Sequence, residues 1–341
     1  YSQSQFSRLT HRTRGALFSL RTGLKFSNYI IGKVELTPGR LATVLDEKDI
    51  DLAVFEYWHS VKAIVYFKRR QIPTILDMHD LLWQSYSRQL SRWYIPVQYK
   101  RWAVGRYRQR EEAAWEEYDG LIAINRAEYN HVMKHLPQKL LFYAPMGIDL
   151  KRWPYSWQAT NPPKIAYYGS LGSARNQEGA WRCYETIMPQ VWEQHPKAEL
   201  WIIGNNPPAR IQALPKCDPR VFVTGFVPDV QNVLAKMTVV ACPWEGRFGF
   251  RSRFIEVMAL GIAVVTTPDA VYGMGLEPSQ GLYLGDDDMA LATQLLKLLA
   301  DPVLLARSST QARRQVEEQF SFDQTYGCLS SDMVDWLSSA K

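Results

Sequence analysis

"TVVACPWEGRFGFRSRFIEVMALGIAVVTT", residues 238–267, contains a complete strand–helix–strand unit. Its two ends, 238–243 and 262–267, are apolar on both faces, which is typical of strands buried in a parallel sheet. Between them, residues 253–261 repeat apolar side chains at helical spacing. Because parallel strands need a long crossover connection, usually a helix, the stretch predicts an α/β fold.

The same alternation extends along the chain in both directions from this unit. Further strands are predicted at 164–169, 198–204 and 220–225, and in the first half at 51–56, 73–78, 119–124 and 139–144. Helical stretches separate most of these runs. We therefore expect two doubly wound Rossmann-type domains that face a cleft. Their predicted limits are 1–150 and 151–320, followed by a C-terminal helix in 321–341 that packs back on the N-terminal domain.

Composition describes an ordinary globular protein with a preference for acidic partners. The 341 residues are 46% apolar and 22% charged, with a net charge of +6. The four cysteines lie far apart without metal-ligand spacing, so we expect no zinc site and no disulfide framework. No apolar run approaches ~20 residues, and no signal peptide is evident. We expect a cytoplasmic location, with or without peripheral attachment to the inner face of the membrane.

The glycine- and arginine-rich loop before residues 253–261 contains a candidate anion site. Gly249 leaves the backbone permissive, and the N–H groups of a helix start bind anions. Arg251 and Arg253 would add charge-assisted bonds to phosphate, and Glu256 would accept hydrogen bonds from hydroxyl groups. The alternative is a surface ion pair between Arg253 and Glu256 with a solvated Arg251. This stretch alone favours neither.

Three other predicted strands of the second half end in loops of the same kind. The first ends at Gly169 and is followed by Arg175 and Asn176. The second is followed by Asn205, and the third by the segment 226–230. Because the carboxyl ends of parallel strands meet at one edge of a sheet, these loops together predict a nucleotide-binding crevice.

These residues carry a resemblance to a known family. The order "GSL" (169–171) with Asn176, "TGFVPDV" (224–230), R-x2-E-x-MA-x-G (253–261) and G-x-G (273–275) resembles the donor domain of family 4 glycosyltransferases. These enzymes have the GT-B fold, and the resemblance covers residues 164–325. It implies that residues 1–150 form the acceptor-side domain and 151–320 the donor domain.

The resemblance implies a role for each matching residue. Glu256 matches the glutamate that holds the ribose hydroxyls of a nucleotide-diphosphate sugar, and Arg253 takes a position near the diphosphate. Arg175 and Asn176 fall where the family carries an Arg/Lys pair, and Phe226 and Val227 match the segment whose backbone contacts the base. Phe248 stands where the family has a first glutamate, and Glu245 lies three residues earlier. This departure leaves the donor sugar open.

The first half matches the family more loosely. His79 follows a predicted strand, and in similar enzymes a histidine in this region contacts the donor sugar or phosphate. The alternative is that His79 merely caps a turn, while His59 is expected to be an ordinary surface residue. Such domains open with a strand and a glycine-rich loop, which residues 1–28 lack. We therefore expect the first βα units to be absent from this chain.

The segment 87–110 interleaves cations with aromatic side chains. This composition suits an anionic membrane surface or a lipid-linked acceptor, and it also suits single-stranded nucleic acid. A solvated helix with a buried aromatic stripe is the structural alternative.

The leading interpretation is a hexosyltransferase-type glycosyltransferase, retaining and metal-independent as the resemblance implies. It moves sugar from a nucleotide-diphosphate sugar to a glycan, lipid-linked or other acceptor, with His79, Arg253 and Glu256 as the catalytic residues and no cofactor beyond the co-substrate. The alternatives are a sugar-nucleotide-binding protein without activity, and a nucleic-acid-binding protein.

Overall fold

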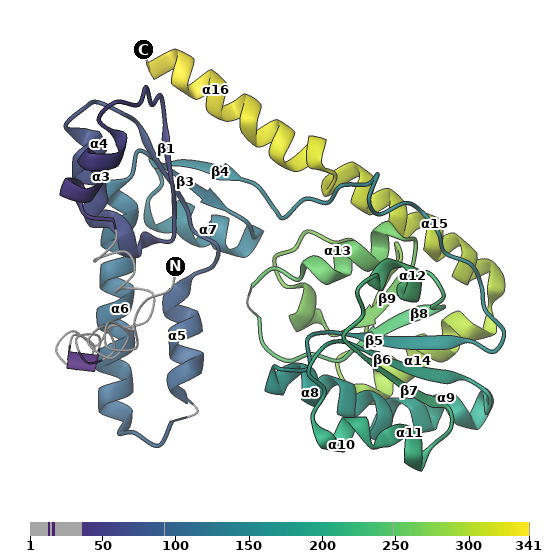
Figure 1. Ribbon diagram of the computed structural model, residues 1–341. Helices are drawn as coiled ribbons and strands as arrows, with labels where there is room; N and C mark the ends of the chain where they lie inside the picture. The colour runs from purple at the N-terminus through teal and green to yellow at the C-terminus, as the bar shows by residue number, and fades with distance from the viewer. Residues whose placement is uncertain (1–12, 14–15, 18–35, 92, 248, 341) are drawn as a thin grey trace. The chain divides into compact units, whose positions relative to one another are not determined.

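The computed structural model describes residues 13, 16–17, 36–91, 93–247 and 249–340. Contacts divide the chain into two compact units, Tyr1–Ala144 and Pro145–Lys341, which are described separately below (Figure 1). Residues 321–341 belong to the second unit by their contacts. The domain limits at 150 and 320, and the packing of the last helix on the N-terminal domain, stay predictions.

The first unit contains a parallel four-stranded sheet in the order β1-β2-β3-β4. Its strands are β1 (Ala53–Glu56), β2 (Thr74–Asp77), β3 (Gly120–Ala123) and β4 (Leu140–Tyr143), so all four predicted strands are confirmed. Its helices are α3 (Pro38–Leu45), α4 (Ile64–Lys68), α5 (Leu82–Ser91), α6 (Val97–Glu117) and α7 (Arg126–His135), with a 3-10 helix at Trp58–Ala63. The core of this unit includes the fully buried Trp115, Tyr118 and Leu121.

Helices α5 and α6 pack against each other as a hairpin (Figure 1). The buried carboxylate of Glu111 on α6 accepts the backbone N–H groups of Leu82 at 2.8 Å and Trp83 at 2.7 Å, at the start of α5. It satisfies two of the donors that a helix leaves unpaired at its N-terminus. Burial raises the pKa of Glu111 to about 8 even though these N–H bonds favour the ionised form.

His59 is not the surface residue that the sequence predicted. Its side chain is buried beneath α6, where Nε2 lies 2.7 Å from the hydroxyl of Tyr107 and the ring stacks on Trp58 at 4.5 Å. The expectation was wrong because the burial comes from a helix 48 residues away in sequence.

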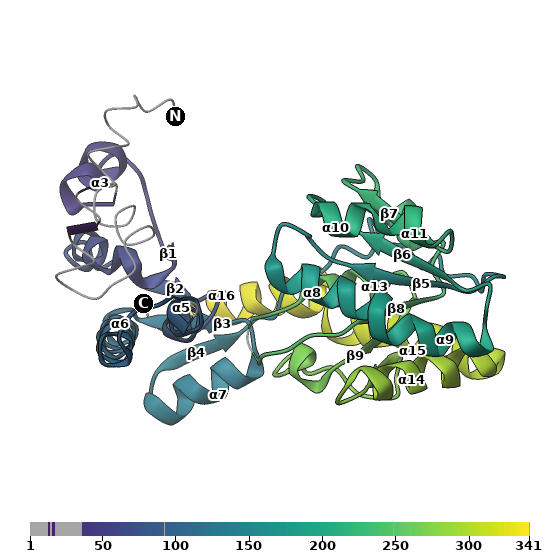
Figure 2. The ribbon, with the colours of Figure 1, turned by 90° about the horizontal axis from the view of Figure 1, so that it is seen from below.

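The second unit contains a parallel six-stranded sheet in the order β10-β9-β8-β5-β6-β7. Its strands are β5 (Lys164–Tyr168), β6 (Glu199–Ile203), β7 (Val221–Gly225), β8 (Val239–Cys242), β9 (Ala263–Thr266) and β10 (Leu282–Leu284). Figure 2 shows the succession from β7 to β9. Five of these strands were predicted, and the three-residue β10 was not. The strand order reverses between β5 and β8, which is the topological switch point of a doubly wound sheet.

The helices of the second unit surround this sheet. They are α8 (Ala174–Arg182), α9 (Met188–Gln194), α10 (Ala209–Gln212), α11 (Leu214–Cys217), α12 (Val230–Leu234), α13 (Ser252–Ala259), α14 (Asp288–Ala300), α15 (Pro302–Gln319) and α16 (Cys328–Ala340). Shorter helical turns lie at Cys183–Ile187, Pro268–Val271 and Asp323–Gly327. Within the described ranges, no single helix has the length and apolar composition to cross a membrane. Helices α14 and α15 have this length and composition only when they are taken together, and the pair is bent by 107°.

We predict that Gly281→Ala destabilises the second unit more than Gly275→Ala does. Both glycines have positive φ, +80° and +76°, so alanine costs about 1–2 kcal/mol of backbone strain at either position. At Gly281 the new Cβ would also lie 2.5 Å from the Cα of Ala312, whereas at Gly275 the nearest neighbour, Oε1 of Gln319, is 3.8 Å away. Overpacking should therefore cost about 1–3 kcal/mol more at Gly281. Equal losses of stability in urea unfolding would contradict this reading.

Candidate functional site

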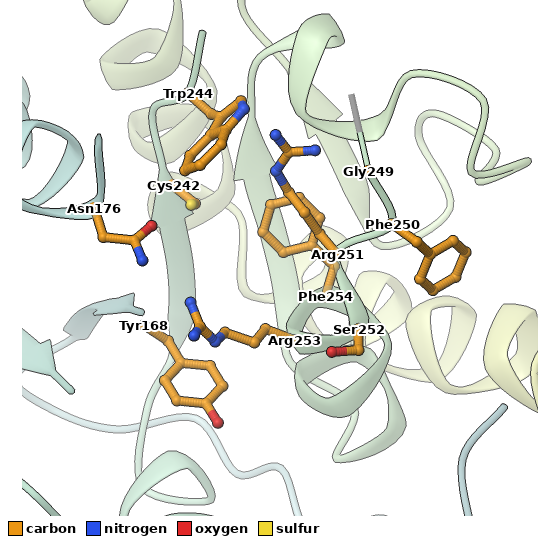
Figure 3. Close-up of a pocket in the computed structure, with 10 residues that line it drawn as sticks. All are labelled: Tyr168, Asn176, Cys242, Trp244, Gly249, Phe250, Arg251, Ser252, Arg253 and Phe254. Carbon is orange, nitrogen blue, oxygen red and sulfur yellow. The ribbon is translucent and has the colours of Figure 1, made fainter. Parts of the chain in front are cut away.

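Two neighbouring cavities lie at the carboxyl ends of the strands, at the switch point of the second sheet. The first has a volume of ≈ 320 Å³ and is lined by Tyr168, Asn176, Cys242, Trp244 and residues 249–254 (Figure 3). The second has a volume of ≈ 190 Å³ and is lined by residues 168–170, 203–205 and 225–227 together with Val230 and Arg253. Tyr168 and Arg253 line both cavities, so the two cavities share a wall.

Arg253 presents its positive charge at the start of helix α13. It is the second residue of that helix, next to the partial positive charge of the N-terminus. Its guanidinium carbon lies 5.5 Å from the ring centroid of Tyr168. Figure 3 shows the guanidinium group directed between Tyr168 and Asn176. A cation placed here, beside a helix start, is suited to bind phosphate oxygens.

Arg251 is held within the protein and is not solvated. Its guanidinium group donates to the carbonyl oxygen of Ala270 at 2.8 Å and lies 4.1 Å from the ring centroid of Trp244. Burial lowers the pKa of Arg251 to about 10, because the charged form loses hydration. The alternative of a solvated Arg251 is therefore wrong.

Glu256 is bonded to a tyrosine. Its Oε2 accepts a hydrogen bond of 3.0 Å from the hydroxyl of Tyr168, and burial raises the pKa of the Glu256 carboxyl group. Among the ion pairs of the described residues, none joins Arg253 to Glu256, so the alternative of a surface ion pair is not found. Glu256 also lines a third cavity of ≈ 370 Å³, together with residues 146–149, Arg152, Trp153, Ser252, Ile255 and Phe322.

Arg175 supports the loop after β8. Its guanidinium group donates to the carbonyl oxygen of Glu245 at 2.8 Å, and it is absent from the linings of the two shared-wall cavities. The carboxylate of Glu245 is 82% exposed and pairs with Arg182 at 3.2 Å. Further along the loop, Arg247 donates to Asp269 at 2.8 Å. Phe248, which stands at the position of the family's first glutamate, lies outside the described residues.

The remaining predicted residues of the second unit meet at the cavities. The Nδ2 of Asn176 donates to the carbonyl oxygen of Ser170 at 2.7 Å, so Asn176 holds the loop that follows β5. Gly169 and Asn205 line the second cavity with Phe226 and Val227, and Gly249 lines the first. The side chain of Phe226 is 74% exposed.

His79 belongs to the first unit, so it is described apart from the cavities. It adopts a φ of +58°, stacks on Tyr57 at 4.5 Å and bonds the carboxylate of Glu56 through Nε2. Its backbone N–H donates to Oδ1 of Asp77 at 3.3 Å. The imidazole does not cap a turn, contrary to the structural alternative. Ligand atoms of Glu56, Asp77 and His79 lie within 4.8 Å of one another, but His79 already pairs with both carboxylates, and no other feature of the described residues points to a metal here.

Sequence reasoning missed Tyr168 and Trp244. Tyr168 is the last residue of β5, and the end of a central strand is where a doubly wound fold presents side chains to a ligand. Trp244 lies between two arginines, with Arg251 at 4.1 Å and Arg175 at 6.0 Å from its ring centroid. An aromatic residue directly after a predicted strand of the second unit was the available signal.

A comparison with protein families finds a match over the part of the chain that contains the cavities. Residues 162–301 match the family model described as "Glycosyl transferases group 1". No curated protein matches the chain.

Solved structures share the fold at low sequence identity. Sucrose-phosphate synthase from Thermosynechococcus elongatus is 18% identical with a TM-score of 0.66, over 89% of this chain and 78% of that one. TarM is 14% identical with a TM-score of 0.64, over 88% of this chain and 57% of TarM. Anabaena Alr3699/HepE in complex with UDP is 15% identical with a TM-score of 0.62, over 89% and 82%.

The family match covers the strands and loops that form the two cavities, from β5 to helix α14. Residues 162–301 therefore match the glycosyl transferases group 1 family, and the chain shares the GT-B fold of the solved structures above.

Proposed function

We propose that the chain transfers a sugar, with retention of configuration and without a metal, from a nucleotide-diphosphate sugar to a glycan or lipid-linked acceptor. The observation that carries this proposal is the arrangement of Arg253 and Glu256 on one face of α13. Arg253 lines both cavities, and Glu256 accepts a hydrogen bond from Tyr168, which also lines both cavities. A cation and a carboxylate at this spacing suit a diphosphate followed by a ribose.

The cavities suggest where each part of the donor binds. The second cavity, with Asn205, Phe226 and Val227, is assigned to the base. The ribose lies towards Glu256, and the diphosphate lies between Arg253 and the start of α13. The first cavity, beside Trp244, is assigned to the sugar. Because UDP is bound in the HepE structure, UDP is the first nucleotide to test.

Electrostatic stabilisation of the leaving diphosphate would lower the activation barrier of the transfer. Arg253 and the helix N-terminus are positioned before the reaction, so no solvent reorganisation is needed as negative charge develops. Arg251 contributes by holding the loop through Ala270 and Trp244, and Arg175 does so through Glu245. On this proposal, Arg251 and Arg175 support the site and Arg253 contacts the donor.

We expect Arg253→Ala to weaken binding of UDP by about 10- to 150-fold, because a hydrogen bond to a charged group contributes roughly 1.5–3 kcal/mol. Glu256→Gln should weaken it in the same direction. Titration calorimetry with UDP, GDP and ADP measures the change and identifies the base. Arg314→Ala and Glu318→Gln are the controls, because these residues form an exposed pair on α15. Unchanged affinity in both site variants would overturn the donor assignment.

His79 is proposed to contact the donor sugar or phosphate during transfer. Glu56 and Tyr57 hold its imidazole in one orientation. We expect His79→Ala to lower the rate of sugar transfer at saturating donor while leaving UDP affinity within about twofold, because Arg253 and Glu256 dominate nucleotide binding on the proposal above. Transfer of radiolabelled sugar measures the rate. A normal rate would remove His79 from the mechanism.

Turnover also separates the proposal from the two alternatives. A sugar-nucleotide-binding protein would bind UDP but transfer no radiolabel to a membrane extract that contains acceptors. A nucleic-acid-binding protein would be retained on single-stranded DNA at physiological salt.

The α5–α6 hairpin supports peripheral attachment to an anionic membrane as part of this proposal. Residues 81–110 contain no Asp or Glu. Near the end of the hairpin, Trp93 is 65% exposed, Tyr94 is fully exposed and Trp102 is 43% exposed. Aromatic side chains at this end, next to exposed cations such as Arg101, suit the boundary between lipid headgroups and acyl chains. Among the aromatic residues of 87–110, the buried-stripe alternative holds for Tyr107 alone.

We expect the protein to co-sediment with vesicles that contain phosphatidylglycerol, and less so at high salt, because each Lys or Arg near such a surface contributes ~1 kcal/mol. Changing Trp93 and Tyr94 together to serine should reduce this binding. Val303→Ser, which alters an exposed apolar residue on α15, should not. Equal binding to neutral phosphatidylcholine vesicles would contradict the attachment, as would no binding to either.

A further inference from the structure

Tyr168 connects the two residues that the proposed function assigns to the donor. Its hydroxyl donates to Oε2 of Glu256 at 3.0 Å, and its ring lies 5.5 Å from the guanidinium carbon of Arg253. The side chain projects from the end of β5, which lies at the switch point of the sheet. It also lines both cavities, of which Figure 3 shows the first.

We propose that Tyr168 is a positioning residue that orients the Glu256 carboxylate towards the ribose diol and fixes its spacing from Arg253. This inference rests on the proposed function, in which Glu256 accepts hydrogen bonds from the ribose and Arg253 binds the diphosphate.

The hydrogen-bonding capacity of Glu256 permits this role. An ionised carboxylate has about four lone-pair sites on its two oxygens. Tyr168 occupies one site on Oε2, which leaves the other sites to accept the two hydroxyl groups of a ribose. Because the phenol uses only one of these acceptor sites, it restricts the rotation of the carboxylate and still leaves acceptor sites for the diol.

The hydrogen bond also favours the charged form of Glu256. Burial raises the pKa of its carboxyl group, while the bond from Tyr168 and the charge of Arg253 lower it. Asp149 and Arg152 line the third cavity with Glu256 and carry opposite charges. Burial and the nearby carboxylate raise the pKa of the Tyr168 hydroxyl, so this group stays protonated and remains the donor at neutral pH.

The ring of Tyr168 makes a separate contribution. A guanidinium group near the face of a tyrosine ring is attracted by the ring quadrupole. Arg253 therefore has a preferred place beside the phenol that bonds Glu256. Tyr168→Phe keeps this ring and removes only the hydroxyl, so it isolates the contact with Glu256.

The test measures the affinity of Tyr168→Phe for UDP and for inorganic pyrophosphate. We expect UDP binding to weaken by about 10-fold, within the range for a hydrogen bond to a charged group, and pyrophosphate binding to stay unchanged because pyrophosphate has no ribose. In a Glu256→Gln background the same substitution should cause little further loss, because the two residues act through one contact. Tyr184→Phe is the control, since this partly buried tyrosine lines neither cavity.

The pH dependence gives a readout that a general packing defect would not change. UDP affinity should fall as the pH drops through the pKa of Glu256, because the protonated carboxyl group accepts the diol less well. Removing the Tyr168 hydroxyl removes an interaction that lowers this pKa. The fall should therefore begin at a higher pH in Tyr168→Phe than in the wild type.

The possible results distinguish this inference from the proposed function. If Glu256→Gln weakens UDP binding but Tyr168→Phe does not, the role of Tyr168 is wrong and the donor site stands. Equal losses for UDP and pyrophosphate, or an unshifted pH profile, also overturn the role. If the wild type binds no nucleoside diphosphate, or Glu256→Gln binds UDP normally, the proposed function fails and the inference fails with it.

Discussion

The parallel pairing of β5 with β8 is the constraint on which the second unit depends. Ile165 and Ala166 pair with Val239 and Val240, and the chain continues outwards from these strands in opposite directions. The loops after β5 and β8 therefore diverge and leave space above the carboxyl ends of the strands. The first cavity is lined from both sides of this divergence, by Tyr168 and Asn176 on one side and by Cys242 and Trp244 on the other.

Two arginines at the start of α13 have different roles because their surroundings differ. The guanidinium group of Arg251 turns towards Trp244 and Ala270, where it fixes the loop. That of Arg253 faces the cavities and lies near Tyr168. Both cations oppose the partial positive charge of the helix start, so an anion bound there would relieve an unfavourable arrangement. Arg253 lines both cavities, whereas Arg251 lines only the first.

Much of the fold could be predicted from the sequence because the strands carry their own signal. Runs such as 238–243 are apolar on both faces, which is typical of a strand buried in a parallel sheet. The strand β10 was missed because it has three residues at the edge of the sheet, too few to form a pattern. The burial of His59 was missed because its partner Tyr107 lies 48 residues away.

The same distinction between near and distant partners applies to the residues of the candidate site. Arg253 and Glu256 could be found because they lie three residues apart within one motif. The part played by Tyr168 could not, because its partner Glu256 is 88 residues away and the bond exists only in the folded sheet.

All the residues assigned to the nucleotide come from the second unit, which has its own core. His79 and the α5–α6 hairpin come from the first unit, which has a separate core. If the proposed roles hold, nucleotide binding and membrane attachment rest on different cores, whereas sugar transfer needs both units. A substitution in the first core would then lower transfer without weakening UDP binding, because no residue that binds the nucleotide depends on that core.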